Sequence, residues 1–149
     1  MISIALFEPD IPQNTGSLIR LAACMGVALH IIEPCGFPFD DKRVHRASMD
    51  YYDLAVIKRH SSWQKFLESR HGRLILLTTK ATQAYTEFAF KPDDILLLGR
   101  ESSGVPDHVR AAVDVSVTIP MQSQARSLNV ALAASMVLGE AIRQVKELT

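Results

Sequence analysis

The sequence contains few of the residues that build disulfide frameworks, metal centres or strongly charged surfaces. Cysteine occurs only as Cys24 and Cys35, without the paired spacing of a metal site, so we expect two reduced thiols. The five histidines are scattered, which argues against a metal centre. Sixteen basic residues balance 16 acidic ones, so an RNA partner would need a local basic patch rather than a net positive charge.

Long apolar runs and targeting segments are also missing. No stretch approaches the roughly 20 apolar residues of a membrane-spanning helix. The N-terminus lacks the basic start and apolar core of a signal peptide. We therefore expect a cytoplasmic protein without a membrane partner, and the 149 residues predict one domain (1–149) with no appended module.

Several common enzyme fingerprints are absent. There is no G-x-G-x-x-G after the first apolar run, no Walker A lysine loop, no H-E-x-x-H and no G-x-S-x-G. The usual dinucleotide fingerprint, P-loop hydrolysis and the hydrolase nucleophile elbow therefore lose support. An α/β enzyme with a different nucleotide cofactor remains an alternative, disfavoured by the missing phosphate-binding loop.

The sequence does contain alternating apolar strands and amphipathic helices. Apolar runs predict strands at residues 2–7, 28–32, 54–58, 74–78, 94–98 and 116–119. Helices are predicted at 15–25, 62–69, 106–113 and 128–146, with a short helix or ordered loop at 40–47. This alternation predicts an α/β domain with a mainly parallel sheet covered by helices. Ligands bind at the carboxyl ends of such strands, where three polar loops lie, so we expect one shared site.

The first polar loop runs from Pro9 to the helix that contains Arg20. Asn14 is expected at the helix start, either as a simple cap or as a site residue. Arg20 lies in an otherwise apolar helix and is expected on its buried side. An arginine there would need a phosphate, carboxylate or carbonyl partner.

The second polar loop follows the strand that ends at Leu98. Gly99 is expected to permit close approach to a ligand, and Gly104 to permit the turn before the next helix. Glu101 is expected to accept hydrogen bonds from Arg20 or from a ligand. A plain strand-to-helix turn would explain the glycines but not Glu101.

The third polar loop extends from Ile119 to Asn129. Ser127 is predicted to cap the closing helix, where unpaired backbone N–H groups gather. Such a junction suits a polar ligand, although a cap without a ligand would explain Ser127 by itself.

Taken together, these motifs resemble the three motifs of the SPOUT methyltransferases. Glu8-Pro-Asp-Ile-Pro-Gln-Asn-Thr-Gly, His30-Ile-Ile-Glu-Pro and Ser127-Leu-Asn are similar to the small subgroup that methylates the 2′-hydroxyl of the tRNA wobble nucleotide. The resemblance implies a C-terminal trefoil knot, a homodimer and S-adenosyl-L-methionine bound in the knot. The implied substrate is a wobble cytidine or modified uridine in the anticodon stem-loop of tRNA. No metal is implied.

The resemblance also implies roles for individual residues. Catalytic or RNA-facing positions are matched by Asn14, Arg20, Glu101, Ser127 and Asn129. Cofactor-binding positions are matched by Leu77, Thr78, Thr79, Gly99, Ile119, Pro120, Met121 and Ser127. A guanidinium is a poor base, so we expect Arg20 to clamp a phosphate and stabilise developing negative charge. Gly139 departs from the tyrosine common in relatives, so this chain would lack any dimer or RNA contact made by that aromatic.

RNA binding would depend on local charge. The densest basic cluster contains Lys42, Arg43 and Arg46, which with Arg20 are the predicted RNA-binding residues. For any one of them, a solvated surface position is the simpler explanation. Two alternatives remain at this point: methylation of another tRNA or rRNA site, and an RNA-binding homologue that lacks catalysis.

Overall fold

The computed structural model describes residues 1–148, and its framework is one six-stranded sheet. The strands are β1 (Ser3–Phe7), β2 (Ala28–Ile32), β3 (Ile57–His60), β4 (Leu74–Leu77), β5 (Ile95–Leu98) and β6 (Val115–Val117). They lie in the order β3-β2-β1-β5-β4-β6, and every neighbouring pair is parallel. The predicted parallel sheet is therefore confirmed.

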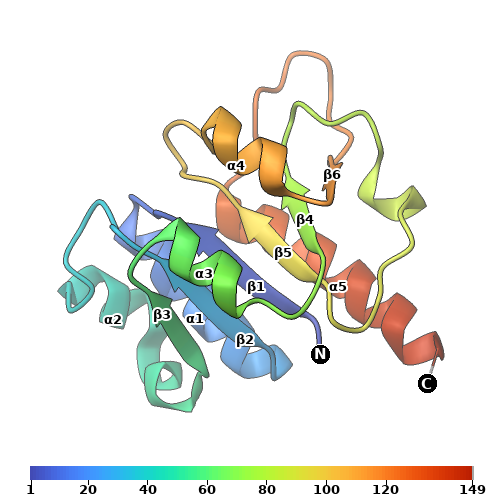
Figure 1. Ribbon diagram of the computed structural model, residues 1–149. Helices are drawn as coiled ribbons and strands as arrows, with labels where there is room; N and C mark the ends of the chain where they lie inside the picture. The colour runs from blue at the N-terminus through green and yellow to red at the C-terminus, as the bar shows by residue number, and fades with distance from the viewer. Residues whose placement is uncertain (149) are drawn as a thin grey trace.

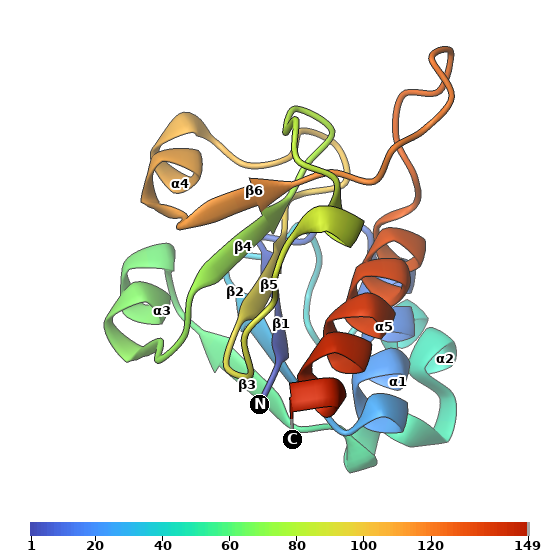
Figure 2. The same cartoon turned by 90° about the vertical axis from the view of Figure 1, so that its right-hand side faces the viewer.

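Helices cover both faces of the sheet, as Figures 1 and 2 show. One face carries α1 (Pro12–Met25), α2 (Lys42–Ser48) and α5 (Val130–Leu148); the other carries α3 (Trp63–Ser69) and α4 (Asp107–Ala112). Two 3₁₀ segments, Met49–Leu54 and Tyr85–Glu87, lie in the connections. None of the described helices is long and apolar enough to cross a membrane.

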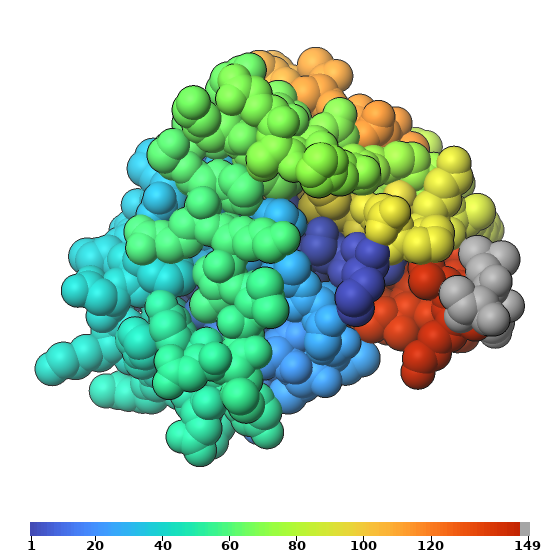
Figure 3. Space-filling view, turned by 60° about the horizontal axis from the view of Figure 1, so that its bottom comes forward, coloured from blue at the N-terminus to red at the C-terminus, as the bar shows by residue number. Residues whose placement is uncertain are grey.

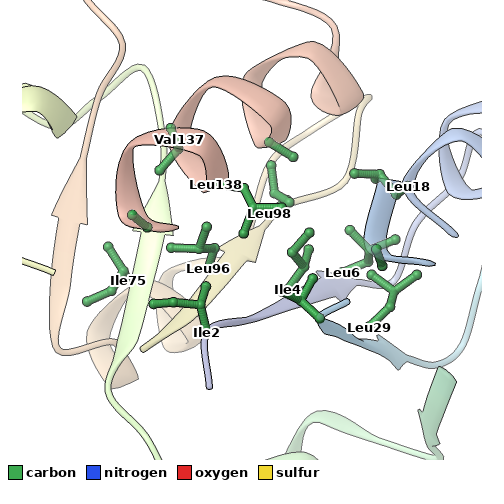
Figure 4. Close-up of a cluster of buried hydrophobic side chains, with 14 of the residues drawn as sticks. Ile2, Ile4, Leu6, Leu18, Leu29, Ile75, Leu96, Leu98, Val137 and Leu138 are labelled. Atoms are coloured by element: carbon green, nitrogen blue, oxygen red, sulfur yellow. The ribbon is translucent and has the colours of Figure 1, made fainter. Parts of the chain in front are cut away.

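The core has two parts because side chains alternate along each strand. Ile4 and Leu6 of β1 point toward the face of α1 and α5, where Leu18 and Val137 join them (Figure 4). Side chains on the other face of the strands pack with Phe66 of α3 and with α4. Sheet and helices are thereby fixed to each other, which holds the strand ends in place.

Several element boundaries differ from those predicted. Helix α1 begins at Pro12 rather than at residue 15, since proline is well suited to the first helical position. The predicted strand at 54–58 is displaced: Met49–Leu54 is 3₁₀, and β3 begins at Ile57. Leu54 and Val56 are exposed, so their apolar character does not mark a buried strand. Gly26, in the left-handed conformation, follows the last residue of α1, and Ser62 caps α3, so the helix ends predicted at residues 25 and 62 agree with the structure to within one residue.

The chain's N-terminus lies at the end of the sheet opposite the polar loops. The Met1 ammonium pairs with Asp93, and the space-filling view shows this terminus between the segment before β5 and helix α5 (Figure 3). Nearby, Arg73 makes two hydrogen bonds of 2.8 Å to the buried carboxylate of Asp94. This end of the sheet is thus closed by ion pairs.

Two histidines that appear scattered in the sequence meet on neighbouring strands. Nδ1 of His30 on β2 lies 2.9 Å from Nε2 of His60 on β3, and both rings pack against Phe66. Burial lowers the pKa of His30 to about 4, and the neighbouring His60 and Lys58 act in the same direction. Burial lowers the pKa of His60 as well.

We expect the protein to lose stability as the pH falls from about 6.5 toward about 4, because the unfolded chain takes up protons that folded His30 resists. A His30→Phe variant keeps an aromatic ring but cannot titrate, so its stability should depend less on pH over this window. Urea unfolding measured across the window checks this. His108→Gln, a change at an exposed histidine, is the control; equal slopes for wild type and His30→Phe would contradict the expectation.

Candidate active site

A pocket of about 210 Å³ lies at the carboxyl end of the sheet. Its walls come from the ends of β4, β5 and β6 and from the start of α5, within residues 77–79, 98–104, 117–121 and 127–137. The polar loops after β1 and β5 lie side by side at this end because β1 and β5 are neighbours in the sheet. Ligand sites in open α/β sheets occur where the strand order reverses in this way.

The lining of this pocket is mainly apolar, with polar groups at its rim. Leu98, Val117 and Val137 supply apolar walls, while Arg100 and Glu101 are the charged residues of the lining. This composition suits a flat, largely uncharged group such as a purine better than a phosphate.

Gly99 and Gly104 bring two backbone segments unusually close. The amide N–H of each of Arg100 and Gly104 donates to the carbonyl of the other, at 2.9 and 2.8 Å. A Cβ at Gly99 would lie 2.6 Å from the carbonyl carbon of Gly104, and Gly104 has a φ of +68°. The turn predicted at Gly104 is present, while the close approach at Gly99 is to backbone of the same loop.

Most of the predicted cofactor residues lie on the pocket wall. Leu77, Thr78, Thr79, Gly99, Ile119, Met121 and Ser127 all contribute to the lining. Pro120 does not, although both of its neighbours do. Sequence reasoning missed Thr118, which lines the pocket and whose N–H and carbonyl bond to Gln83 and Tyr85.

The loops after β4 and β6 are joined by backbone hydrogen bonds beside the pocket. Thr78 donates to Val117, Tyr85 donates to Thr118, and Thr118 donates to Gln83, all at 2.9 to 3.0 Å. Both loops rise from the same end of the sheet in Figures 1 and 2. The predicted knot would involve this region, and it stays a prediction.

A hydrogen-bonded chain of side chains connects three of the predicted catalytic residues. The side-chain amide of Asn129 donates to Oδ1 of Asn14 at 3.0 Å, and Nδ2 of Asn14 donates to the Glu101 carboxylate at 3.5 Å. Glu101 also accepts from the backbone of Asp10 at 3.0 Å, and its own N–H donates to the Asp10 carboxylate at 3.2 Å. The three polar loops are thereby held together at one place.

Asp10 and Glu101 form a pair of interacting carboxyl groups. Hydrogen bonding with Glu101 lowers the pKa of Asp10, and the hydroxyl of Ser102 contributes in the same direction. Burial raises the pKa of Glu101, and the hydrogen bond with Asp10 adds to the rise. Sequence reasoning missed Asp10, whose position in Pro9-Asp-Ile-Pro, directly after a strand, was the available signal.

The closing helix is capped by a different residue from the predicted Ser127. Helix α5 begins at Val130, and the side-chain oxygen of Asn129 accepts from the N–H groups of Ala131 and Leu132, at 2.8 and 3.2 Å. Asn129 is therefore the cap. Ser127 lies before the helix and lines the pocket instead. Asn14, predicted at a helix start, is the third residue of α1.

Arg20 lies elsewhere than predicted. It is exposed, its guanidinium is 2.8 Å from the sulfur of Met49, and it lies over the Tyr51 ring at 5.2 Å. It does not donate to Glu101 and is not part of the pocket lining. Arg20 follows Asn14 by six positions on α1, which corresponds to a rise of about 9 Å and a rotation of about 240° around the helix axis. The two side chains therefore leave α1 in different directions.

The predicted basic patch is on α2. Lys42, Arg43 and Arg46 are all exposed, but Arg43 makes two side-chain bonds to Asp41, at 2.8 and 3.0 Å. Lys42 and Arg46 have no ion-pair partner among the described residues. Among residues 1–148, no group of three or more histidine, cysteine, aspartate or glutamate side chains is placed to hold a metal ion.

The family profile and the sequence relatives that match this chain are those of RNA methyltransferases. The profile of the SpoU rRNA Methylase family matches residues 1–139. A tRNA (cytidine(34)-2'-O)-methyltransferase from Beijerinckia indica is 56% identical over 146 residues, covering 95% of this chain and 91% of the relative.

Solved structures agree with the sequence relatives. One, described as giving structural insights into the 2-OH methylation of C/U34 on tRNA, has a TM-score of 0.94 at 36% identity, covering 99% of this chain and 97% of the other. The SpoU methyltransferase AviRb from Streptomyces viridochromogenes, in complex with the cofactor AdoMet, has a TM-score of 0.85 at 28% identity. That match covers 95% of this chain and 57% of AviRb.

Proposed function

This chain belongs to the SpoU rRNA methylase family, and we propose that it methylates the 2′-hydroxyl of the wobble nucleotide, position 34, of tRNA. Its cofactor is S-adenosylmethionine, and its substrate nucleotide is a cytidine or a modified uridine. The observation that carries the proposal is the 56% identity to a tRNA (cytidine(34)-2'-O)-methyltransferase over nearly the whole chain. We take the chain to be a single methyltransferase domain.

The residues of the pocket suit this cofactor. Apolar side chains of β5, β6 and α5 would enclose the adenine, and the strand-end backbone of 77–79 and 119–121 would hydrogen-bond to it. The lining contains one cation, Arg100, and one carboxylate, Glu101, and this balance of charge does not favour a phosphate ligand. Ser127 would lie beside the ribose or the methionine part.

S-adenosylmethionine supplies an electrophilic methyl group and a neutral thioether leaving group. Transfer would form a bond from the RNA 2′-hydroxyl oxygen to this methyl carbon as the carbon–sulfur bond breaks, the bonding pair leaving with the thioether sulfur and the hydroxyl proton passing to water or to a phosphate oxygen. Arg20 would hold the adjoining phosphate and stabilise negative charge on the attacking oxygen. Asn14, Glu101 and Asn129 would hold the loops that position the nucleotide, since each is fixed by the others.

Methylation of total tRNA from a strain that lacks the gene, followed by nucleoside mapping, tests the proposal. We expect a 2′-O-methyl group at the wobble position and nowhere else. Label at another tRNA position or in rRNA would replace the proposed substrate. Binding of tRNA and cofactor without transfer would instead favour a homologue that has lost catalysis.

We also propose that the protein acts as a homodimer. Exposed apolar side chains gather where α1 and α5 begin: Ile11 and Leu128 precede these helices, and Leu132 and Met136 lie on α5. The bond between Asn14 and Asn129 joins the same two helix starts. A second copy of the chain would cover this apolar face. Gly139, seven residues after Leu132, lies on the same side of α5, where a Cβ would meet nothing within 4 Å.

A Met136→Glu variant is expected to weaken dimerisation at least tenfold, because it places a charge in a buried apolar interface. Met25→Glu is a matched control: Met25 is also 44% exposed, but it lies at the far end of α1. Sedimentation velocity over a range of protein concentrations measures the dimerisation of both variants. Equal association of the two variants would contradict a dimer at this face.

Lys42 and Arg46 are expected to contribute to tRNA binding through phosphate contacts. Replacing both with methionine should weaken tRNA binding and reduce the slope of log affinity against log salt concentration by about 1.5. Filter binding between low and moderate salt measures the slope. An unchanged slope would mean that α2 is only a solvated surface.

A further inference from the structure

A second cavity of about 210 Å³ adjoins the cofactor pocket. The two share the walls formed by Thr78, Thr79, Gly99 and Gly104. The second cavity extends from these walls toward α4, where Lys80, Ser103 and Arg110 line it. A group bound there would lie beside the cofactor pocket.

Arg110 contributes a guanidinium to the lining of this cavity. One terminal nitrogen of its guanidinium donates to Asp107 at 3.0 Å, while its Nε is buried and has no hydrogen-bond partner among the described residues. The side chain as a whole is 34% exposed, so the second terminal nitrogen of the guanidinium can donate to a ligand oxygen in the cavity.

Lys80 supplies a second positive charge. It is exposed in the loop after β4, its backbone N–H donates to the Thr78 hydroxyl, and its ammonium has no ion-pair partner within residues 1–148. The Ser103 hydroxyl adds a neutral donor. No carboxylate lines the cavity, and Asp107, the acid that contacts Arg110, is fully exposed. Two cations and a hydroxyl with no acid among them favour an anion.

We propose that Lys80, Ser103 and Arg110 form a subsite for a backbone phosphate of the tRNA close to the methylated nucleotide. This inference rests on the proposed function, because it takes RNA as the substrate. The carboxylate of the cofactor is a poorer occupant, since its own ammonium group would be repelled by the two cations and would find no acid in the lining. A phosphate held here would fix the target ribose beside the methyl group.

Lys80→Met, Arg110→Met and the double variant test the subsite with unmodified tRNA transcripts. We expect tRNA binding to weaken about tenfold in the double variant, and the salt slope to fall by about 0.8 for each charge removed. Cofactor affinity, measured by calorimetry, should not change. Lys65→Met, at an exposed lysine of α3, is the control for loss of one charge. Lys80→Met by itself tests the idea even if Arg110→Met disturbs α4.

The possible results separate the subsite from the function. Unchanged tRNA affinity and salt slope, with normal cofactor binding, would overturn the subsite and leave the methyltransferase intact. Weaker cofactor binding with unchanged tRNA binding would assign the anion to the cofactor's carboxylate and also overturn it. A wild-type protein that binds neither cofactor nor tRNA would refute the proposed function, and the subsite with it.

Discussion

An Arg20→Ala variant is expected to bind S-adenosylmethionine as tightly as the wild type and to transfer methyl groups to tRNA at least a hundredfold more slowly. The first part follows from geometry, because Arg20 is exposed and outside the pocket lining. The second follows from its proposed contact with the phosphate and the developing oxyanion, since loss of one such donor typically lowers turnover by about 10²–10³. Calorimetry and single-turnover methylation measure the two quantities separately.

Two further variants at this position distinguish the reasons for the loss. Arg20→Lys keeps the charge but not the planar pair of donors, so a large loss is expected there too. Near-normal turnover of Arg20→Lys would show that two-point clamping is the wrong role. Met49→Leu removes the sulfur that Arg20 contacts at 2.8 Å while preserving bulk, and should change turnover only a few-fold.

A Gly99→Ala variant is expected to lose roughly tenfold to a hundredfold in cofactor affinity. Its Cβ would lie 2.6 Å from the carbonyl carbon and 2.8 Å from the Cα of Gly104, and backbone atoms cannot rotate aside as a side chain can. The loop must shift, which disturbs walls shared by both cavities; overpacking of this kind generally costs about 1–3 kcal/mol. Calorimetric titration with S-adenosylmethionine measures the effect.

Gly139→Ala is the matched control for that experiment. It makes the same chemical change on α5 outside the pocket lining, where the new Cβ meets nothing of its own chain within 4 Å. Cofactor affinity should stay the same, and alanine's better helix propensity should stabilise the chain by up to about 1 kcal/mol. Normal cofactor binding by Gly99→Ala would mean that the loop between Gly99 and Gly104 adapts freely.

The position of Arg20 illustrates what a local pattern cannot give. Its apolar neighbours predicted the buried side of the helix, yet Leu18, Ile19 and Ala22 are buried and Arg20 is exposed. Successive helical residues are about 100° apart, so Arg20 lies at least 100° from each of those three. The number of apolar neighbours therefore predicted burial of Arg20 wrongly. The angular positions of those neighbours around the helix, once its bounds are known, place Arg20 away from them.

The cap of α5 illustrates a second limit. Ser127 and Asn129 are both good capping residues, and only two positions separate them. Which of the two caps α5 depends on the residue at which the chain turns into the helix. In the folded chain Asn129 also donates a hydrogen bond to Asn14 on a different helix, and no local sequence preference records such a contact.

The sequence alone predicted the order of strands and helices, the parallel sheet and the end of the sheet at which the pocket lies. It did so because apolar periodicity records which face of each element is buried, and parallel strands direct their following loops to one end. The folded structure adds the adjacency of β1 and β5, which brings Asp10 to Glu101 across 91 residues of chain, and the bond between Asn14 and Asn129 across 115. Contacts between such distant residues depend on how the whole core packs, and no single segment encodes that packing.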